Sequence, residues 1–350
     1  MEVSRDHLTV VLNALFDAGE TTIPVRHPCE DIGELLRIEL NTHSESTVRF
    51  TQGAMQYRQR RDDVRRRYGD EPYEDLPGHN EYVKAAVAGG LLPPENEPEL
   101  RAFLDRHTYP DLAAGHDPVM LALDTNLFGF RIPEILDLDP QTGNTDERDR
   151  TPTNGYVLSG GVKAELDWHY KRFETRPLED AFGEEIARLR DQPAGANRLG
   201  FLGLYEYRRR LANRSVDLVP SDTGDAAIVD AYAEYDETHR KRAVVLSNDY
   251  GFIDRAREAD LSAHHVAVPV DLPRTVTTSW EDIATTLSIL AVMFGVLVLP
   301  KVTLYGVWTG KSGLEWQREQ LDVDVRSPIV EPQLDRDLSL VEEFATISHT

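Results

Sequence analysis

The sequence predicts an α/β fold, a three-layer α/β/α sandwich built on a central parallel sheet. Between residues 119 and 270, short runs rich in Val, Leu and Ala alternate with stretches that have helical spacing. The runs are continuously apolar, which is typical of strands buried on both faces of a parallel sheet. Because helix-forming sequence separates the runs, right-handed crossovers can join consecutive strands.

The order of the elements follows from these runs. We expect strands at residues 119–124, 156–158, 215–220, 242–249 and 262–270. We expect helices that start at Gly160 and Asp225, and others over residues 179–190, 200–211 and 252–259. A polar loop without periodicity, residues 138–155, separates the first two strands.

The flanking regions have a different texture. Residues 1–115 are polar and mostly helical in pattern, so a helical N-terminal region is expected there. The α/β domain is expected over residues 116–273. Residues 274–350 should form a C-terminal appendix, with a buried helix over 280–299 and an antiparallel hairpin with arms at 302–308 and 320–327.

Charge bears on the setting of the protein. Acidic residues number 61 against 38 basic ones, which gives a net charge of -23, and only six of the basic residues are Lys. Such a surface stays hydrated in concentrated salt, where the Debye length is about 3 Å or less. A halophilic protein is therefore expected, and an acidic protein from ordinary salt is the alternative. The acidity argues only modestly against a polynucleotide substrate, since salt weakens counterion release in any case.

Cysteine and apolar content limit other classes. The single Cys29 excludes an intramolecular disulfide and a thiolate metal cluster. The N-terminal segment lacks the basic-then-apolar order of a signal peptide. The apolar segment 286–308 has an unbroken stretch of only residues 289–299, too short for a bilayer. We expect a cytoplasmic protein without stable membrane association.

Four carboxylates are expected at one edge of the sheet. Asp124 ends the first strand and Asp249 ends the fourth, while Asp225 opens the helix after the third strand and Glu165 lies in the helix after the second. In open parallel sheets, function gathers at the carboxyl ends of the strands. Carboxylates about 5 Å apart repel by roughly 3 kcal/mol, so they bind protons or a cation. Oxygen-only ligands suit Mg²⁺ or Mn²⁺, and the predicted chemistry is phosphodiester hydrolysis.

Each acid also has a structural interpretation. A single Asp at a strand end is commonly a loop or cap residue, and in so acidic a chain acids are weak evidence. Asp225 can be the N-cap of its helix, and Glu165 can lie on a solvated helix face. What favours the joint interpretation is the order of the four acids along the chain and their positions next to the strands.

Residues 118–272 resemble the PIN-domain nucleases. The resemblance depends on LALDTN, VLSGGVKAEL, SVDLVP with GDAAIVDAY, VVLSNDYGF and HVAVPV. It implies a five-stranded parallel sheet and a site in which these four acids bind one or two Mg²⁺ or Mn²⁺ ions and cut RNA, leaving 5′-phosphate and 3′-hydroxyl ends. Asn126 and Ser247 match the small polar positions beside the first and fourth acids, where hydrogen bonds orient the ligands. The long insertion between the first two acids, the helical stretch before the third and the terminal additions depart from minimal members of the family, and they leave the substrate open.

An arginine-rich run supplies candidate phosphate contacts. Arginine suits bidentate contact with phosphate. The alternative is an intramolecular salt-bridge face, because Asp62 and Asp63 lie within the run. The candidates are Arg58, Arg60, Arg61 and Arg65, with a second group at 208–210.

The sequence thus predicts a halophilic endoribonuclease that uses Mg²⁺ or Mn²⁺ and has RNA as its partner. A homodimer stays open, as does RNA against DNA. Two other interpretations remain: a catalytically silent module that binds nucleic acid or protein, and a flap-type DNA nuclease that uses the same acids.

Overall fold

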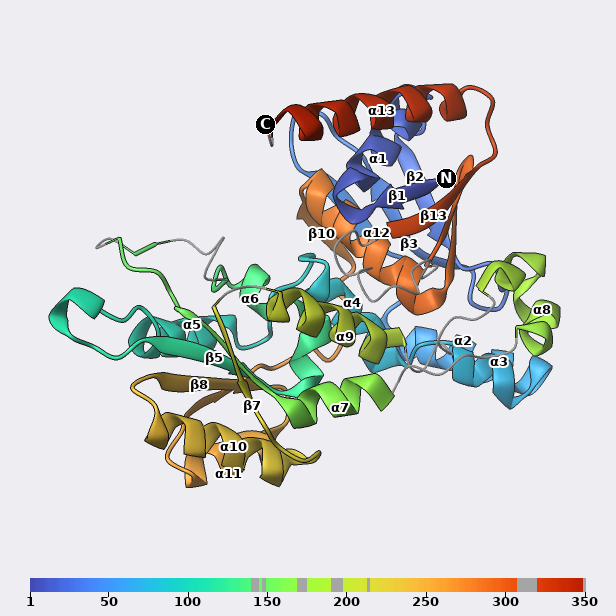
Figure 1. Ribbon diagram of the computed structural model, residues 1–350. Coiled ribbons are helices and arrows are strands. Elements are labelled where there is room, and N and C mark those ends of the chain that lie inside the picture. Colours follow the sequence, from blue (N-terminus) through green and yellow to red (C-terminus); the bar gives the residue numbers. More distant parts are fainter. Residues whose placement is uncertain are drawn as a thin grey trace. The chain divides into compact units, whose positions relative to one another are not determined.

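The computed structural model describes residues 1–139, 145–146, 149–168, 175–189, 198–212, 215–306 and 320–348 (Figure 1). The chain forms two compact units. Unit 1 comprises Met1–Leu92, Lys171–Arg198 and Val270–Thr350, and unit 2 comprises Pro93–Tyr170 and Leu199–Pro269. The three consecutive segments expected from the sequence therefore need correction. The N-terminal and C-terminal segments belong to one unit, because their strands share one sheet.

Unit 2 is built on the five-stranded parallel sheet that the apolar runs predict. Its strand order is β7-β6-β5-β8-β9, and every neighbouring pair is parallel. All residues of β5 and β6 are buried, as continuous apolar runs require. The five predicted strands are thus confirmed, although the last ends at His265 and not at residue 270: β5 (Val119–Leu123), β6 (Gly155–Ser159), β7 (Val216–Val219), β8 (Arg242–Ser247) and β9 (Ser262–His265).

Helices cover this sheet, so the unit is a mixed α/β structure. In Figure 1, α10 and α11 lie on one side of the strands and α9 on the other. Ile228, Val229 and Tyr232 give α10 a buried stripe at helical spacing. The helices of unit 2 are α5 (Glu97–His107), η2 (Leu112–Ala114), η3 (Thr125–Phe130), α6 (Ile132–Ile135), α7 (Gly160–Trp168), α9 (Arg198–Leu211), α10 (Asp225–Thr238) and α11 (Tyr250–Glu258).

The side on which successive strands join the sheet changes between β5 and β8, while all strands stay parallel. From β5 the chain adds β6 and β7 on one side, and then β8 and β9 on the other. In open parallel sheets, ligands bind outside the carboxyl ends of the strands at such a switch point. The backbone N–H of Asp124 donates to the carbonyl oxygen of Leu246 at 3.1 Å, so the ends of β5 and β8 lie side by side there.

Unit 1 is built on an eight-stranded sheet with the order β1-β13-β12-β11-β2-β3-β4-β10, in which every pair is antiparallel. Four of its strands fall within residues 1–50, where mostly helices were expected. Three of these four pair with strands beyond residue 270, β1 with β13, β2 with β11 and β4 with β10, so distant partners stabilise them. The strands are β1 (Glu2–Ser4), β2 (Thr22–Arg26), β3 (Glu34–Glu39), β4 (Ser46–Phe50), β10 (Thr275–Thr278), β11 (Val296–Leu299), β12 (Val302–Tyr305) and β13 (Gln320–Val325).

The C-terminal predictions are confirmed in outline. The predicted helix from Trp280 is α12 (Trp280–Phe294), which Ser279 caps by accepting from the N–H of Asp282 at 3.1 Å. It ends earlier than expected because Gly295 adopts a φ of 80°, and β11 follows. The expected hairpin arms pair as β12 and β13, with residues 307–319 outside the described part. Other helices of unit 1 are η1 (Arg5–His7), α1 (Leu8–Asp17), α2 (Ala54–Tyr68), α3 (Asp70–Asp75), α4 (His79–Ala88), α8 (Arg176–Phe182), η4 (Glu184–Leu189) and α13 (Val330–Ser348).

Among the residues that the structure describes, no helix combines the length and apolar character needed to cross a membrane.

Unit 1 also buries titratable groups. Arg198, which is the first residue of α9 but still belongs to unit 1, forms an ion pair with Asp75 at 3.2 Å, with side chains only 2% and 4% exposed. His27 lies against the rings of Phe182 and Phe294, and its Nδ1 accepts from the N–H of Cys29 at 3.1 Å. Burial, with the positive charge of Arg198 second, lowers the pKa of His27 to about 3.

The buried His27 predicts a loss of stability in acid. Its pKa is about 3 in the folded chain and about 6.5 when unfolded, so below pH 6.5 the unfolded chain binds the extra proton and stability falls. His27→Asn keeps an acceptor for Cys29 but does not titrate. In urea unfolding between pH 6 and pH 4, the parent should lose up to about 1.4 kcal/mol per pH unit more than the variant. Parallel pH profiles would contradict this assignment.

Candidate functional site

Asp124 is the centre of the candidate site, directly after β5. It is only 3% exposed. Its Oδ2 accepts hydrogen bonds from Ser247 Oγ at 2.6 Å and from Asn126 Nδ2 at 3.1 Å. Ser247 Oγ in turn accepts from the backbone N–H of Asp249 at 2.8 Å, so its own proton points to Asp124. The two small polar residues singled out from the sequence therefore both hold the first acid, and Ser247 joins it to the fourth.

The environment of Asp124 disfavours its charge. Burial is the main cause that raises its pKa to about 6, and the negative charge of Asp225 adds to it. The hydrogen bonds from Ser247 and Asn126 act in the opposite direction but do not cancel the effect. Asp124 and Asp225 thus lie close enough to share one electrostatic environment, although they are far apart in the chain.

Glu165 of α7 lies between the end of β5 and the start of α10. Its Oε1 accepts from the N–H of Gly224 at 2.8 Å, and its Oε2 accepts from the hydroxyl of Thr125. These donors are the neighbours of Asp225 and Asp124, respectively. The carboxylate is therefore held next to the first and third acids and does not lie free on a helix surface.

Glycine at position 161 permits this close approach. A Cβ on Gly161 would lie 2.2 Å from the carbonyl oxygen of Asp222, which no side chain tolerates. The N–H of Gly161 donates to Ser159 Oγ and to Ser221 Oγ, both at 3.0 Å. The start of α7 is thus fixed against the loop that leads into α10, and this brings Glu165 to Gly224.

Asp225 and Asp249 differ in how they meet their helices. The alternative that Asp225 caps α10 is wrong, because Gly224 occupies the N-cap position and Asp225 is an exposed residue of the first turn. Asp249, in contrast, is the N-cap of α11. Its Oδ1 accepts from the N–H groups of Gly251 at 2.6 Å and of Phe252 at 3.3 Å.

The four acids are linked by contacts but do not form a closed ligand cage. In the described residues, no group of three or more His, Cys, Asp or Glu side chains is arranged to hold a metal ion. The carboxylates of Glu165 and Asp249 accept N–H and O–H donors instead. The oxygen-only donor set fits Mg²⁺ or Mn²⁺, and such an ion would have to compete with these hydrogen bonds.

Two tyrosines belong to this edge and were not predicted. Tyr232 of α10 is buried and donates its hydroxyl to the carbonyl oxygen of Leu123 at 3.1 Å, which fixes α10 to the end of β5. Tyr250, directly after Asp249, is 66% exposed. Its ring stacks on His265 with 3.7 Å between centroids and 14° between planes. The only sequence signal for it was an aromatic residue directly after the fourth acid.

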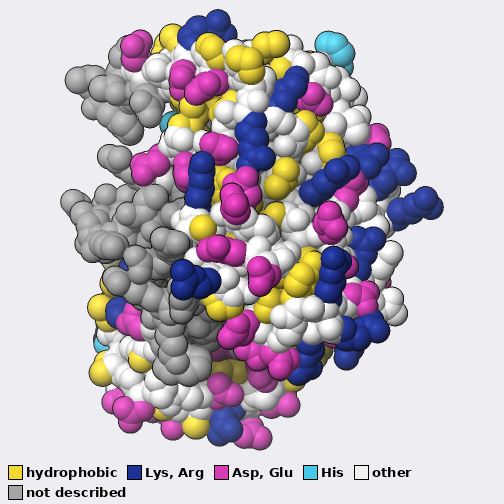
Figure 2. Space-filling model, turned by 90° about the vertical axis from the view of Figure 1, so that its right-hand side faces the viewer, with side chains coloured by type: hydrophobic (Ala, Val, Ile, Leu, Met, Phe, Trp, Pro, Cys, Tyr) yellow, Lys and Arg dark blue, Asp and Glu magenta, His cyan; other side chains and the backbone are white. Residues whose placement is uncertain are grey.

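The arginine candidates belong to α2 of unit 1. Three of the four make contacts within the chain, which favours the structural alternative. Figure 2 shows Lys and Arg side chains interspersed with Asp and Glu side chains on the face drawn. Arg58 is exposed, Arg60 donates to the carbonyl oxygen of Ile32 at 2.6 Å, Arg61 donates to that of Tyr73 at 3.1 Å, and Arg65 pairs with Asp70 at 2.5 Å.

The second arginine group is also structural. Arg210 is 5% exposed and its guanidinium lies 3.1 Å from Glu134 and 3.2 Å from Glu206, both on unit 2. Arg209 also pairs with Glu134, at 3.1 Å. The pairs with Glu134 hold α9 against α6, so Arg209 and Arg210 are engaged within the unit, while Arg208 lies 4.0 Å from Asp167.

Comparisons of the chain with models of protein families, with curated proteins and with solved structures found no match. Any functional assignment therefore depends on the residues of the site.

Because the pKa of Asp124 is raised, its ionised form destabilises the folded chain at neutral pH. Because its pKa is about 6 when folded and about 3.9 when unfolded, stability is complete below pH 4 and is lost as the pH rises through 6. Asp124→Asn removes this cost. At pH 7.5 with EDTA, the variant should unfold in urea with roughly 2–3 kcal/mol more free energy than the parent, and the difference should vanish near pH 4. If the variant is no more stable than the parent at pH 7.5, burial does not raise the pKa of Asp124.

Proposed function

We propose that this chain is a divalent-metal-dependent nuclease that hydrolyses RNA phosphodiesters at the carboxyl edge of the unit 2 sheet. The environment of Asp124 is the main support for this proposal. Asp124 is buried at the switch point of the sheet, and hydrogen bonds from Ser247 and Asn126 hold it while Asp225 adds a second negative charge. A buried carboxylate with a second negative charge near it is typical of sites that bind a cation.

The residues have distinct roles in this proposal. Asp124, Asp225 and Asp249 would hold Mg²⁺ or Mn²⁺, and Glu165 would complete the site directly or through water. The bound ion would lower the pKa of a water molecule and neutralise charge on the phosphate. Ser247 and Asn126 keep the Asp124 carboxylate in one orientation, and Glu165 helps to position the attacking water.

Tyr250 offers a surface for a nucleobase. Its ring is exposed, stands next to Asp249 and is backed by the 9% exposed His265, whose Nε2 contacts the carbonyl oxygen of Asn248 at 3.1 Å. Unpaired bases stack on aromatic side chains of this kind, and the contact tolerates any sequence. The expected substrate is therefore single-stranded RNA.

A binding module without turnover is the second candidate. The hydrogen bonds that engage the carboxylates of Glu165 and Asp249 favour it, because a ligand cage would need those oxygens. Such a module would bind RNA equally in Mn²⁺ and in EDTA.

Cleavage of RNA by site variants tests the proposal. With Mn²⁺, Asp124→Asn and Asp249→Asn should each lower the cleavage rate roughly a hundredfold or more, since each removes a proposed metal ligand. Asp254→Asn, which changes an exposed acid on α11, is the matched control and should cleave like the parent. The assay runs in low salt and in molar KCl, because the acidic composition predicts activity in salt.

Two readouts separate the outcomes of this assay. Mn²⁺ should raise the melting temperature of the parent and of Asp254→Asn, but not that of Asp124→Asn. Branched DNA tested beside the RNA distinguishes a flap-type nuclease. A parent that binds RNA without cutting RNA or DNA would leave the binding module in place of the nuclease.

Tyr250→Ala should weaken the substrate complex. Loss of one base stack is worth about 1–3 kcal/mol, so KM for single-stranded RNA should rise about fivefold to a hundredfold, with kcat much less changed. Tyr250→Phe keeps the ring and should retain the parent KM. Phe344→Ala removes a side chain of α13 that is 67% exposed, and it controls for loss of surface aromatic area. If both alanine variants leave KM unchanged, Tyr250 does not contact the substrate.

A further inference from the structure

A hollow opens in unit 2 at the amino ends of the strands. Its volume is about 460 Å³, within the range of about 300–1,000 Å³ usual for small-molecule sites. Three lining residues lie at the starts of strands: Val119 in β5, Arg242 in β8 and Ser262 in β9. Because the strands are parallel, this edge is opposite the one where the four acids lie. The cavity is therefore separate from the proposed nuclease site.

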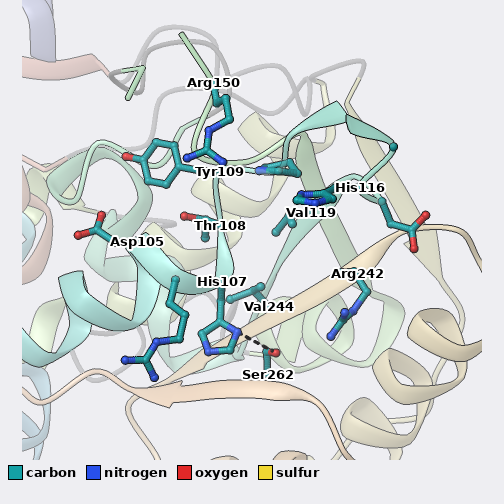
Figure 3. Close-up of a pocket in the computed structure, with 14 residues that line it drawn as sticks. Asp105, His107, Thr108, Tyr109, His116, Val119, Arg150, Arg242, Val244 and Ser262 are labelled. Carbon is teal, nitrogen blue, oxygen red and sulfur yellow. Dashed lines mark hydrogen bonds between the residues drawn. The ribbon is translucent and has the colours of Figure 1, made fainter. Parts of the chain in front are cut away.

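The lining concentrates basic side chains. Three arginines and two histidines face two aspartates, in a chain with 61 acidic and 38 basic residues. They come from α5, the segment after η2, the segment before β6, and β8, so four separate parts of unit 2 converge (Figure 3). The basic residues are Arg106, His107, His116, Arg150 and Arg242, and the acids are Asp105 and Asp117.

Two of these arginines lie near acids that are not part of the cavity lining. Arg150 pairs with Asp146 at 2.5 Å, so part of its charge is neutralised. Arg242 lies 3.7 Å from Asp236, which is too long for a hydrogen bond, and its side chain is 56% exposed. The Arg242 guanidinium therefore keeps donors for a ligand.

His107 lies in the electrostatic field of the basic residues of the cavity. Its Nδ1 lies 3.3 Å from Ser262 Oγ, the contact drawn in Figure 3, and its ring is 4.5 Å from that of Phe103. Burial lowers the pKa of His107, and the positive charges of Arg106 and Arg242 lower it further. Both guanidinium groups thus act on the same point of the cavity wall.

Tyr109 supplies an aromatic wall in an unusual conformation. Its φ is 48°, in the left-handed region that aromatic residues rarely adopt, and its N–H donates to the carbonyl oxygen of Pro152 at 3.0 Å. Backbone strain of this kind gathers at ligand sites. In Figure 3 the Arg150 side chain extends toward the Tyr109 side of the cavity, so charge and ring lie together.

We propose that this cavity binds a small molecule that carries a phosphate monoester and an aromatic ring, of the class of nucleoside monophosphates. Arg106 and Arg242 bind the phosphate, since planar guanidinium groups match its oxygens. Tyr109 contacts the base. The volume accommodates more than an inorganic ion, and the acids of the other edge take no part.

Calorimetric titration of the full chain tests the site with adenosine 5′-monophosphate, inorganic phosphate and adenosine. The monophosphate should bind, phosphate should compete with it, and adenosine should bind at least about tenfold more weakly. Arg106→Gln and Arg242→Gln should each weaken binding about tenfold or more, the value of one charge-assisted hydrogen bond. Arg101→Gln is the matched control: it lies on the same helix, pairs with Glu97 at 2.7 Å and is not part of the lining.

Asp124→Asn separates this site from the nuclease proposal, because it should bind the monophosphate like the parent. Loss of binding in that variant would place the nucleotide at the acids and overturn the inference. Equal affinity for adenosine, unchanged affinity in both arginine variants, or no binding to the parent would overturn it as well. Circular dichroism of each variant confirms the fold, and Arg106 is exposed on α5, so its replacement leaves the core intact.

Discussion

A carboxylate is buried where β5 and β8 end side by side, and the candidate site is arranged around its charge. Asp124 cannot leave this position, because the continuous apolar run of β5 fixes the strand and its own N–H is bonded to β8. The ionised form therefore loses hydration, and Ser247 and Asn126 restore only part of that loss. A positive charge at this edge would relieve both the burial and the repulsion from Asp225. That need, more than any single contact, is the physical basis for the proposed metal site.

Much of unit 2 could be predicted from the sequence, and the reason is physical. Parallel strands buried on both faces need continuous apolar runs, which leave a local signal at β5 and β8. In unit 1, β2 (TIPVR) alternates between exposed and buried residues, and β1, β2 and β4 pair with segments more than 200 residues away. No local pattern specifies such partners. The helical interpretation of residues 1–115 is correct for α1 to α5 and wrong for β1 to β4, because it used only local spacing.

In the candidate site, too, some features could be predicted from the sequence and others could not. Topology alone brings four carboxylates to the carboxyl edge, so their neighbourhood could be predicted from strand order. The direction in which each carboxylate points could not, since Asp249 caps its helix and Glu165 meets Gly224 through contacts that no spacing rule contains. The arginine run illustrates the converse. Its residues suggested phosphate contacts, but their guanidinium groups meet Ile32, Tyr73 and Asp70 instead.

In the proposed nuclease, one divalent cation binds these acids together. A crystal of the full chain soaked in Mn²⁺ and measured near the manganese absorption edge would locate the ion by its anomalous scattering. We expect a peak within about 2.0–2.5 Å of oxygens from Asp124, Asp225 and Asp249, with Glu165 bonded directly or through water. A map with no peak at this edge, and with Asp249 still bonded to Gly251, would contradict it.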